Sequence, residues 1–536
     1  MSYQIPAEEY LKKAGLEIVE RLLSEPDATY KTFKEVRRSI CKKYHLKSIP
    51  SNTYILSLLP NEERSRFKDQ LRTKPTRTAS GIAIIGVMTK PHPCPHGTCI
   101  FCPGGVRFGT PQSYVKNEPG VLRAIEYGYD PYKQVTSRVD LLTSSGHQVS
   151  KAELIIIGGT FLSLPRNYQR DFVKGCFDGL NGTRSLNLKE AHKNAEQAKI
   201  RNVGLTIETK PDWCMREHID LMLSYGTTRV EIGVQALNDE VYRLVNRGHT
   251  LLDVVNSFRY AKDSGLKIVA HMMPGLPGSS PERDLDDLHQ LFRDPDFKPD
   301  MLKIYPTLVL EDTPLYNMYR IGKYQPCDVE TMVNIMVEVK KFIPRWVRIM
   351  RVQREIGANE ISAGVKKSNL RELALNEAKN RGIICRCIRC REVGLRELRT
   401  GTTVEPENIR LLREDYESSN GTEVFLSCED AVNDILIGFV RLRMPSSKAH
   451  RPEVTGRSGI IRELHVYGSV VPVGKREDDG WQHKGYGVRL MREAEKICAE
   501  EFNGNKMVVI SAVGTREYYR ALGYRLEGPY MIKRLN

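Results

Sequence analysis

The sequence predicts an α/β fold, a full or partial α/β barrel that is preceded by helices and followed by an α+β domain. Between about residues 76 and 372, short apolar strands alternate with helical stretches six times or more. Past about residue 396 the pattern changes to strands with hairpin-like turns around a single amphipathic helix. The first 75 residues show helical periodicity alone.

Two segments near the start, residues 8–25 and 29–46, carry apolar residues at helical spacing. The second is strongly basic and also holds three aromatic residues: Lys31, Lys34, Arg37, Arg38, Lys42, Lys43 and Lys47, with Tyr30, Phe33 and Tyr44. Such a helix either presents a solvated face or follows a phosphate backbone. The interleaved aromatic side chains, which can stack on bases, favour RNA.

Composition limits the class of protein. The 536 residues, of which 40% are hydrophobic, suffice for about three packed domains and argue against long disorder. A net charge of +15 favours a polyanionic partner. The N-terminus lacks the apolar core of a secretory signal and no apolar run is long enough to span a bilayer, so we expect a cytoplasmic protein without membrane partners.

Half of the 12 cysteines lie in two tight triplets, a pattern typical of metal sites in a reducing compartment rather than of disulfides. The first triplet, in CPHGTCIFCPGG, comprises Cys94, Cys99 and Cys102. Three thiolates can hold three irons of a four-iron cluster and leave the fourth iron open for a substrate or cofactor. The alternatives are reduced thiols or a zinc site that includes His92 or His96.

The expected barrel strands are six apolar segments, at residues 82–88, 153–159, 203–209, 229–235, 267–275 and 301–307. Barrel enzymes place their working groups beyond the C-terminal strand ends. The unusual residues of this chain fall there, namely Gly158, Gly159, Thr160, Glu208, Glu231, Gln235, His271, Lys303 and Tyr305.

The second triplet, Cys385, Cys387 and Cys390, offers three thiolates within six residues. Soft sulfur ligands suit zinc, although no fourth ligand is evident nearby. The alternative is unligated buried thiols. We expect a zinc site that pins the barrel to the C-terminal domain.

The C-terminal region has strand candidates at residues 435–444, 460–471 and 506–513, with a helix at 487–502. Gln482-x-x-Gly485-x-Gly487 comes at the start of that helix, where backbone N–H groups and the helix dipole favour a diphosphate. The most polar stretches, residues 412–423 and 474–485, are expected to be surface loops.

The barrel region resembles the radical S-adenosylmethionine (SAM) enzymes, although four residues rather than the usual three separate Cys94 from Cys99. That spacing is characteristic of one family, the catalytic subunit of Elongator and its single-chain archaeal and bacterial relatives. Further segments resemble it along nearly the whole chain, including DPYKQVTSRVDLL, IIIGGTFLSLPRNYQ, TIETKPDWC, VEIGVQ, NRGHT, AHMMPGLPG, RELHVYGSVVPV and GTREYYRALGY.

The resemblance implies four regions: a basic helical tRNA-binding region at 1–75, a radical SAM domain at 76–372, a zinc-binding linker at 373–395 and a GNAT-like acetyltransferase domain at 396–536. It implies a [4Fe-4S] cluster on the first triplet and zinc on the second. It also implies SAM beside Gly158, Gly159 and Thr160, with Glu208 on the ribose and Gln235 nearby. Taken alone, the glycines would be an ordinary turn and Glu208 a structural ion pair.

The Q-x-x-G-x-G order of the C-terminal domain resembles the GNAT acetyltransferases, which bind acetyl-coenzyme A (acetyl-CoA). This likeness implies an acyl-pantetheine arm along Glu463, Leu464, His465 and Val466, and a diphosphate held by Gln482, Lys484, Gly485, Tyr486, Gly487 and Val488. Tyr519 would lie near the thioester and donate a proton. The alternative is that Tyr518 and Tyr519 pack in the core. In the family Lys151 also contacts acetyl-CoA, so Tyr519 and Lys151 are the expected catalytic residues.

The resembled family modifies carbon 5 of the wobble uridine, position 34, of tRNA to a 5-carboxymethyl group. The resemblance implies that a SAM-derived radical takes a hydrogen from the acetyl methyl, that the acetyl radical adds to the uracil ring, and that oxidation and hydrolysis follow. Expected partners are the tRNA anticodon stem-loop and an electron donor; a homodimer stays open. The alternatives are a protein lysine acetyltransferase with a structural barrel, and an RNA-binding scaffold.

Overall fold

The computed structural model describes residues 7–25, 30–46, 48–454, 457–468 and 485–535. The chain forms two compact units. The first comprises residues 1–78 and 136–149, and the second comprises residues 79–135 and 150–536. The expected residues Gln482 and Lys484 lie outside the described part of the chain, as does most of the expected loop at 474–485.

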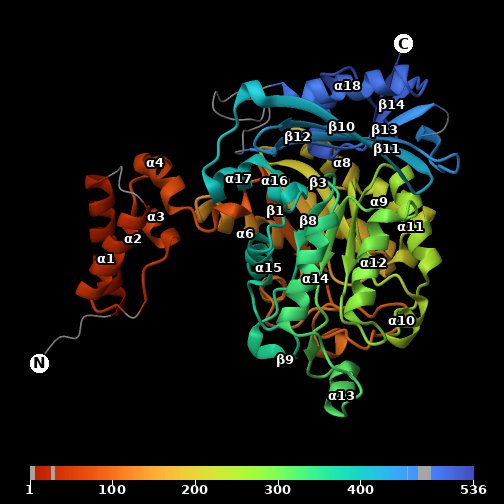
Figure 1. Ribbon diagram of the computed structural model, residues 1–536. Coiled ribbons are helices and arrows are strands. Elements are labelled where there is room, and N and C mark those ends of the chain that lie inside the picture. Colours follow the sequence, from red (N-terminus) through yellow and green to blue (C-terminus); the bar gives the residue numbers. More distant parts are fainter. Residues whose placement is uncertain (1–6, 26–29, 47, 455–456, 469–484, 536) are drawn as a thin grey trace, which may run out of the picture. The chain divides into compact units, whose positions relative to one another are not determined.

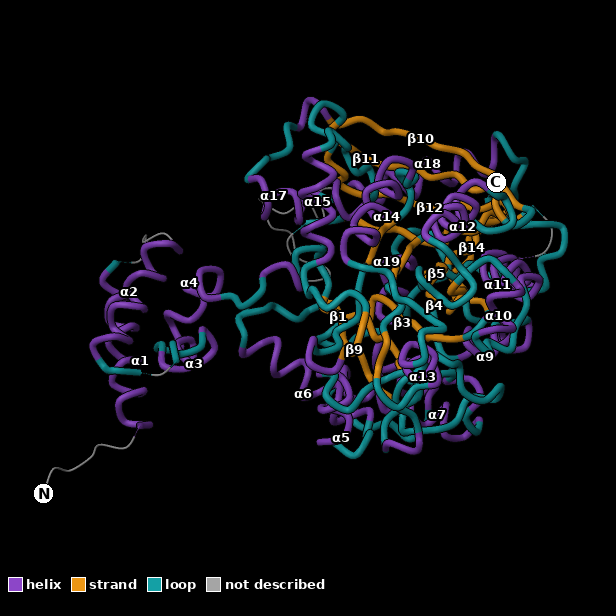
Figure 2. The backbone as a smooth tube through the Cα atoms, turned by 60° about the horizontal axis from the view of Figure 1, so that its bottom comes forward, coloured by secondary structure: helices purple, strands orange, loops and turns teal. Residues whose placement is uncertain are grey.

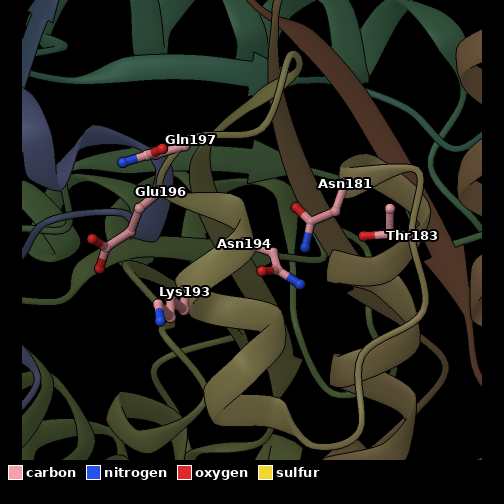
Figure 3. Close-up of a pocket in the computed structure, with 6 residues that line it drawn as sticks. All are labelled: Asn181, Thr183, Lys193, Asn194, Glu196 and Gln197. Carbon is pink, nitrogen blue, oxygen red and sulfur yellow. The ribbon is translucent and has the colours of Figure 1, made fainter.

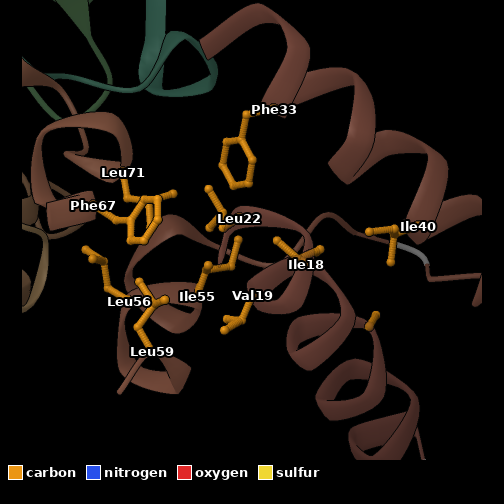
Figure 4. Close-up of a cluster of buried hydrophobic side chains, with 11 residues drawn as sticks. Ile18, Val19, Leu22, Phe33, Ile40, Ile55, Leu56, Leu59, Phe67 and Leu71 are labelled. Atoms are coloured by element: carbon orange, nitrogen blue, oxygen red, sulfur yellow. The ribbon is translucent and has the colours of Figure 1, made fainter. Parts of the chain in front are cut away.

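The first unit is helical, as predicted, with α1 (Ala7–Ser24), α2 (Tyr30–Lys43), α3 (Asn52–Leu58) and α4 (Asn61–Leu71). Their apolar faces meet in one core that includes Ile18, Leu22, Phe33, Ile55 and Phe67 (Figure 4). The Ser51 hydroxyl caps α3 by accepting the backbone N–H of Tyr54 at 3.1 Å.

Two of the aromatic side chains expected to stack on bases make contacts within the protein instead. Phe33 is 4% exposed within the core, so its predicted role is wrong. Tyr44 is half-buried and donates its hydroxyl to Glu17 at 2.7 Å. The helical period places Phe33 on the apolar face of α2, and this burial outweighs base stacking.

The second unit contains a parallel sheet that, in the described residues, runs β1-β2-β3-β4-β5-β6-β8. Its strands are β1 (Ala83–Met88), β2 (Lys151–Ile157), β3 (Arg201–Thr209), β4 (Arg229–Gln235), β5 (Lys267–Met272), β6 (Met301–Ile304) and β8 (Arg348–Arg351). Six of these were predicted, and β8 was missed. β1 and β8 end the sheet without pairing to each other, so the barrel is partial.

Helices connect and cover these strands (Figures 1 and 2). They are α5 (Pro119–Glu126), α7 (Arg166–Asn181), α8 (Leu188–Ala195), α9 (Arg216–Ser224), α10 (Asp239–Leu244), α11 (Leu251–Asp263), α12 (Pro281–Arg293), α13 (Pro314–Arg320) and α14 (Val329–Phe342). The helix α6 (Pro131–Ser144) begins in the second unit, and its residues from 136 onward belong to the first. Because every connection returns to a parallel strand, all the strands end at one rim of the barrel, where the candidate site lies.

A helical segment leads from the barrel to the C-terminal domain: α15 (Leu370–Asn380), α16 (Ile388–Arg391) and α17 (Val393–Thr400). Before it, β7 (Val309–Leu310) pairs with β9 (Ile361–Ala363) in a small antiparallel sheet. The second cysteine triplet lies between α15 and α17, with Cys387 as the N-cap of α16.

The C-terminal sheet runs β10-β11-β12-β13-β14-β16-β15 in the described residues. Its strands are β10 (Ile409–Ser418), β11 (Gly421–Asp430), β12 (Ile435–Met444), β13 (Ser458–Val466), β14 (Lys506–Val509), β15 (Arg525–Glu527) and β16 (Tyr530–Arg534). The helices α18 (Tyr486–Glu500) and α19 (Arg516–Arg520) complete the domain.

One expectation for this domain is wrong. Residues 412–423 form not a surface loop but a hairpin between β10 and β11. Ser419 and Asn420 supply its tight turn, with positive φ angles of 50° and 60°. Charged residues on an edge strand protect it from unwanted pairing, which is why the segment is polar.

The C-terminal sheet lies against the N-terminal ends of the barrel strands. The Arg462 guanidinium on β13 donates to the carbonyl of Leu266, immediately before β5, at 2.8 Å. Arg443 on β12 pairs with Asp263, the last residue of α11, at 2.6 Å. Buried ion pairs thus join the two domains.

Candidate functional site

The first cysteine triplet lies in the loop after β1, at the C-terminal rim of the barrel. Cys99 and Cys102 are buried and Cys94 is half-buried. Among the described residues, the groups whose donor atoms all lie within 4.8 Å of one another include the second triplet but not the first. Wider spacing suits a multi-iron cluster, in which each cysteine binds its own iron, better than it suits a single ion.

Side chains from several loops surround the three sulfurs. Gln112 Nε2 is 3.2 Å from the Cys102 sulfur, and Arg247 NH1 is 3.7 Å from the Cys99 sulfur. His96 Nε2 is 3.3 Å from Cys99. Burial, together with Lys210 and Arg247, lowers the pKa of His96 to about 4, so its ring is neutral at pH 7.

The glycines after β2 form a cradle beside Cys94. Gly158 and Gly159 have positive φ angles of 134° and 72°. A Cβ on Gly159 would lie 3.7 Å from the Cys94 sulfur and 3.3 Å from Gln112 Cβ. The Thr160 hydroxyl is 3.9 Å from the Cys94 sulfur. Bare backbone next to the cysteines fits the predicted SAM position.

Glu208, the penultimate residue of β3, is half-buried in a polar cluster that also contains Glu231 and His271. It accepts a hydrogen bond from the Tyr114 hydroxyl at 2.9 Å, and burial raises its pKa. Glu231 accepts from Lys303, and its carboxylate lies 3.2 Å from His271 Nε2. Although burial opposes it, the Lys303 ammonium holds the pKa of Glu231 well below its usual range.

Gln235 ends β4 with a positive φ of 77°. Its side-chain oxygen is buried and has no hydrogen-bond partner among the described residues. A residue with a strained backbone and an unsatisfied buried oxygen is consistent with a ligand-binding role.

Some of the β13 residues that were predicted to bind acetyl-CoA face the barrel. Glu463 accepts a hydrogen bond from Arg441 at 2.8 Å. Although burial opposes it, the positive charges of Arg441 and Lys267 lower the pKa of Glu463. His465 Nε2 is 3.4 Å from the carbonyl of Ser80. Leu464 instead faces α18, because a Cβ on Gly487 would lie 3.8 Å from its side chain.

The start of α18 provides the expected diphosphate position. Gly485, at φ 89°, caps the helix, and Tyr486, Gly487 and Val488 form its first turn. The backbone N–H groups at the start of a helix point along its axis, and together with the helix dipole they can receive a phosphate.

The two tyrosines of α19 differ in position. Tyr519 is 7% exposed, packs against Tyr518 and Tyr524, and has its pKa raised by burial. The Tyr518 hydroxyl would lie 2.8 Å from a Cβ on Gly487 and is buried without a partner among the described residues. Tyr518 therefore lies against the predicted diphosphate turn, a placement that the sequence did not reveal.

Lys151 begins β2, at the barrel end nearest the C-terminal sheet. Burial lowers the pKa of its ammonium to about 8. A half-buried cation at this end of the barrel fits the contact with acetyl-CoA that the resemblance implies.

The second triplet is compact. The sulfurs of Cys385, Cys387 and Cys390 lie within 4.8 Å of one another, and none of the other His, Cys, Asp or Glu side chains in the described chain joins that group. Tetrahedral zinc with Zn–S bonds of about 2.3 Å would place sulfurs about 3.8 Å apart. Hydrogen bonds from Cys385 and Cys390 lower the pKa of Cys387, so a thiolate is favoured there.

A separate cavity of about 450 Å³ lies at the ends of α7 and α8 (Figure 3). Its walls are polar: Asn181, Thr183, Lys193, Asn194, Glu196 and Gln197. The Glu196 carboxylate pairs with Arg516 and Arg520 of α19, at 3.0 and 2.7 Å. None of these six residues was predicted as a site residue.

Sequence reasoning missed Gln112 and Tyr114 altogether, and it considered Tyr518 only as a residue that could pack in the core. Arg247 lies in NRGHT, one of the segments that carried the resemblance, but it was given no role. Only the fold brings these four residues to the cysteines, to Glu208 and to Gly487.

Four sequence families match the chain: the ELP3 N-terminal domain at residues 11–79, the Radical SAM superfamily at 92–291, the Radical SAM C-terminal domain at 299–380 and the Acetyltransferase (GNAT) family at 393–524. These matches imply a four-iron cluster with SAM in the barrel and acetyl-CoA in the C-terminal domain. None of the helices in the described part of the chain has the length and apolarity that crossing a membrane requires.

Relatives match over nearly the whole chain. Elongator complex protein 3 of Homo sapiens is 46% identical over 510 residues, 94% of this chain and 93% of the relative. The tRNA uridine(34) acetyltransferase of Methanocaldococcus jannaschii is 47% identical over 528 residues, 97% of each. The solved structure of archaeal Methanocaldococcus infernus Elp3 with an N-terminal deletion aligns with a TM-score of 0.76 and 44% identity, covering 85% of this chain and 100% of that one. The chain therefore belongs to the family of Elongator complex protein 3 and tRNA uridine(34) acetyltransferase, acyltransferases that join a radical SAM half-barrel to a GNAT domain.

Proposed function

We propose that this protein modifies uridine 34 of tRNA, replacing the hydrogen on carbon 5 with a carboxymethyl group whose two carbons come from acetyl-CoA. The observation that carries the proposal is the direct contact between the two domains. Buried ion pairs join β12 and β13 of the acetyltransferase sheet to the barrel, as in Arg443 with Asp263. Ordinary acetyl transfer to an amine needs no radical generator, whereas an unactivated pyrimidine carbon does.

In this proposal Cys94, Cys99 and Cys102 hold the four-iron cluster. The Gly158–Thr160 backbone and Glu208 hold SAM, and the buried oxygen of Gln235 offers it a further acceptor. When bound, the cluster and SAM supply a carbon-centred radical after one-electron reduction. The buried walls around them exclude water, which protects such a reactive species.

The acetyltransferase residues bind and orient acetyl-CoA. The first turn of α18 receives the diphosphate, and Leu464 of β13 lies beside it. Lys151 donates to the anionic cofactor while its ammonium is protonated, and Tyr519 donates a proton to the departing thiolate.

The first unit contributes phosphate contacts. On α2, Lys34, Arg38 and Lys42 are exposed, whereas Arg37 donates inward to Asn52 and Lys43 pairs with Glu17 at 2.8 Å. Three exposed cations on one short helix favour a polyanion. Affinity for the anticodon stem-loop should therefore fall steeply with salt.

We further propose zinc for the second triplet. Three thiol sulfurs that all lie within 4.8 Å of one another favour it, and Arg371 and Lys340 near the sulfurs offset their charge. The site fixes the segment between α15 and α17, which connects the barrel to the acetyltransferase sheet.

The rival function is lysine acetylation of proteins. It would need an open path for an amine to β13, but Glu463 of that strand is buried in an ion pair with Arg441. A carboxylate held in this way is poorly placed to act as a general base for a protein amine.

The test is an anaerobic incubation of cluster-loaded protein with reductant, SAM, acetyl-CoA and tRNA, followed by mass spectrometry of the nucleosides. We expect a carboxymethylated uridine that disappears in Cys99→Ala. A histone-tail peptide acetylated equally by Cys99→Ala would instead support the rival. Tight tRNA binding with unchanged nucleosides would support a scaffold.

A further inference from the structure

We propose that Gln112, Arg247 and His96 set the reduction potential of the cluster, by directing N–H groups and positive charge at two of its three cysteine sulfurs. The proposal rests on the proposed function, because it presumes a cluster on Cys94, Cys99 and Cys102. It assigns positioning and tuning roles to residues that the sequence pattern did not single out for them.

Gln112 is held rigidly against Cys102. The side chain is 6% exposed, and its Nε2 is 3.2 Å from the sulfur. On the other side, a Cβ on Gly105 would lie 2.5 Å from the Gln112 amide oxygen, so the glycine leaves just enough room for this orientation. A thiolate only accepts hydrogen bonds, so the amide NH₂ rather than its oxygen must face the sulfur.

Arg247 brings a permanent charge to Cys99. It is 8% exposed, its NH1 lies 3.7 Å from the sulfur, and its NH2 donates to the Gly233 carbonyl at 2.7 Å. A Cβ on Gly233 would lie 2.3 Å from that NH2, so a glycine in β4 is needed for the guanidinium to fit. Anchoring by the strand keeps the charge beside the cluster.

His96 adds a third donor. Its Nε2 is 3.3 Å from the Cys99 sulfur, whereas its Nδ1 is buried and has no partner among the described residues. With a thiolate as the nearest acceptor, the favoured tautomer carries its proton on Nε2. The close approach of Gly248, whose Cβ would lie 2.6 Å from His96 Cβ, fixes the position of the ring.

Electron transfer to the cluster adds one negative charge, which spreads onto the cysteine sulfurs; no bond forms or breaks in that step, and the electron comes from an external one-electron donor. N–H donors and a nearby cation stabilise the more negative, reduced state more than the oxidised one. These three side chains therefore raise the potential and make the cluster easier to reduce. Arginine is suited to this position because it stays protonated under all working conditions.

Potentiometric titration of the full-length, cluster-loaded protein, followed by electron paramagnetic resonance of the reduced cluster, tests the proposal. Gln112→Leu keeps the side-chain volume and removes the donor; Gln112→Glu keeps the shape and adds a negative charge. Arg247→Gln removes the charge. At a fixed potential we expect each of these three variants to lower the ratio of reduced to oxidised cluster by about tenfold. This corresponds to a fall of about 59 mV in the reduction potential for one electron.

Matched controls are Gln290→Leu and Arg243→Gln, which alter exposed residues of the same types. They should leave the potential unchanged. Should one variant fail to take up iron, the other two still decide the matter, since iron content is measured for each. Loaded variants with wild-type potentials would overturn this inference alone, whereas a wild-type protein that takes up no cluster would overturn the proposed function and this inference with it.

Discussion

Asp300 and Arg462 form a two-pronged ion pair with no solvent exposure on either side chain. Asp300 immediately precedes β6 of the barrel, and Arg462 lies on β13 of the acetyltransferase sheet. One prong joins Arg462 NH1 to Asp300 Oδ2 at 3.0 Å, and Asp300 also accepts the backbone N–H of Ile268 at 2.8 Å. Arg441 lies 3.6 Å from the same carboxylate. Asp300 thus adds to Asp263 a second buried carboxylate that connects the two catalytic domains.

We expect Asp300→Asn to lower the free energy of unfolding by about 3–5 kcal/mol, because it removes the carboxylate that the buried Arg462 and Arg441 share. Glu423 and Glu463 are then the remaining carboxylate partners of these two arginines. Urea unfolding followed by intrinsic fluorescence measures this loss. Glu338→Gln, which breaks an exposed pair with Lys341, is the control and should cost less than about 1 kcal/mol. Equal losses in the two variants would refute a special role for Asp300.

Gly159→Ala should weaken SAM binding by more than tenfold. Its φ of 72° disfavours any side chain, and the added methyl would press on Gln112 and point toward the Cys94 sulfur. Gly109→Ala is matched for backbone strain, at φ 66°, but meets nothing within 4 Å. Equilibrium binding of SAM to loaded protein should therefore separate the two variants; similar affinities would mean that backbone strain alone matters.

Lys151 predicts a pH dependence of acetyl-CoA binding. Its pKa of about 8 means that the folded protein loses this positive charge between pH 7 and pH 9. Since the cofactor is anionic, its dissociation constant should rise by about tenfold over that range, as for one charged hydrogen bond of about 1.5 kcal/mol. Calorimetry should show the rise in the wild type and in the exposed control Lys199→Met, but not in Lys151→Met.

We expect the metal on the second cysteine triplet to be lost independently of the iron on the first. Cys387→Ser should lose one equivalent of zinc and retain iron, because its sulfur is one of the three that lie within 4.8 Å of one another. Cys102→Ser should lose iron and retain zinc. Elemental analysis of both purified variants checks this, and a wild-type protein with iron but no zinc would end the zinc assignment.

The sequence pattern predicted those features that depend on residues close together in the chain. Six barrel strands, the first two helices and both cysteine triplets follow from periodicity and spacing within short segments. The hairpin at 412–423 was missed because its polarity resembles a loop, while its pairing with β12 is set by distant residues. Hydropathy also gave no sign that Arg441, Arg443 and Arg462 are buried inside strands.

The site residues also divide into those that local sequence could reveal and those that only the fold brings together. Gly158 and Gly159 follow a strand and could be recognised, but Gln112 reaches Cys102 only after the loop folds back over the cysteines. Buried arginines pair with carboxylates far away in sequence, as Arg443 does with Asp263, 180 residues earlier. A single sequence cannot reveal such partners, because either member alone looks like an ordinary surface charge.

The central claim is that both domains act on one acetyl group, and deuterium tests it most directly. Loaded protein is incubated with tRNA, SAM, reductant and acetyl-CoA whose methyl group carries three deuterium atoms, and the products are analysed by mass spectrometry. The account predicts 5′-deoxyadenosine with one deuterium and a carboxymethylated uridine that keeps the other two. Undeuterated 5′-deoxyadenosine together with an unlabelled uridine would contradict it.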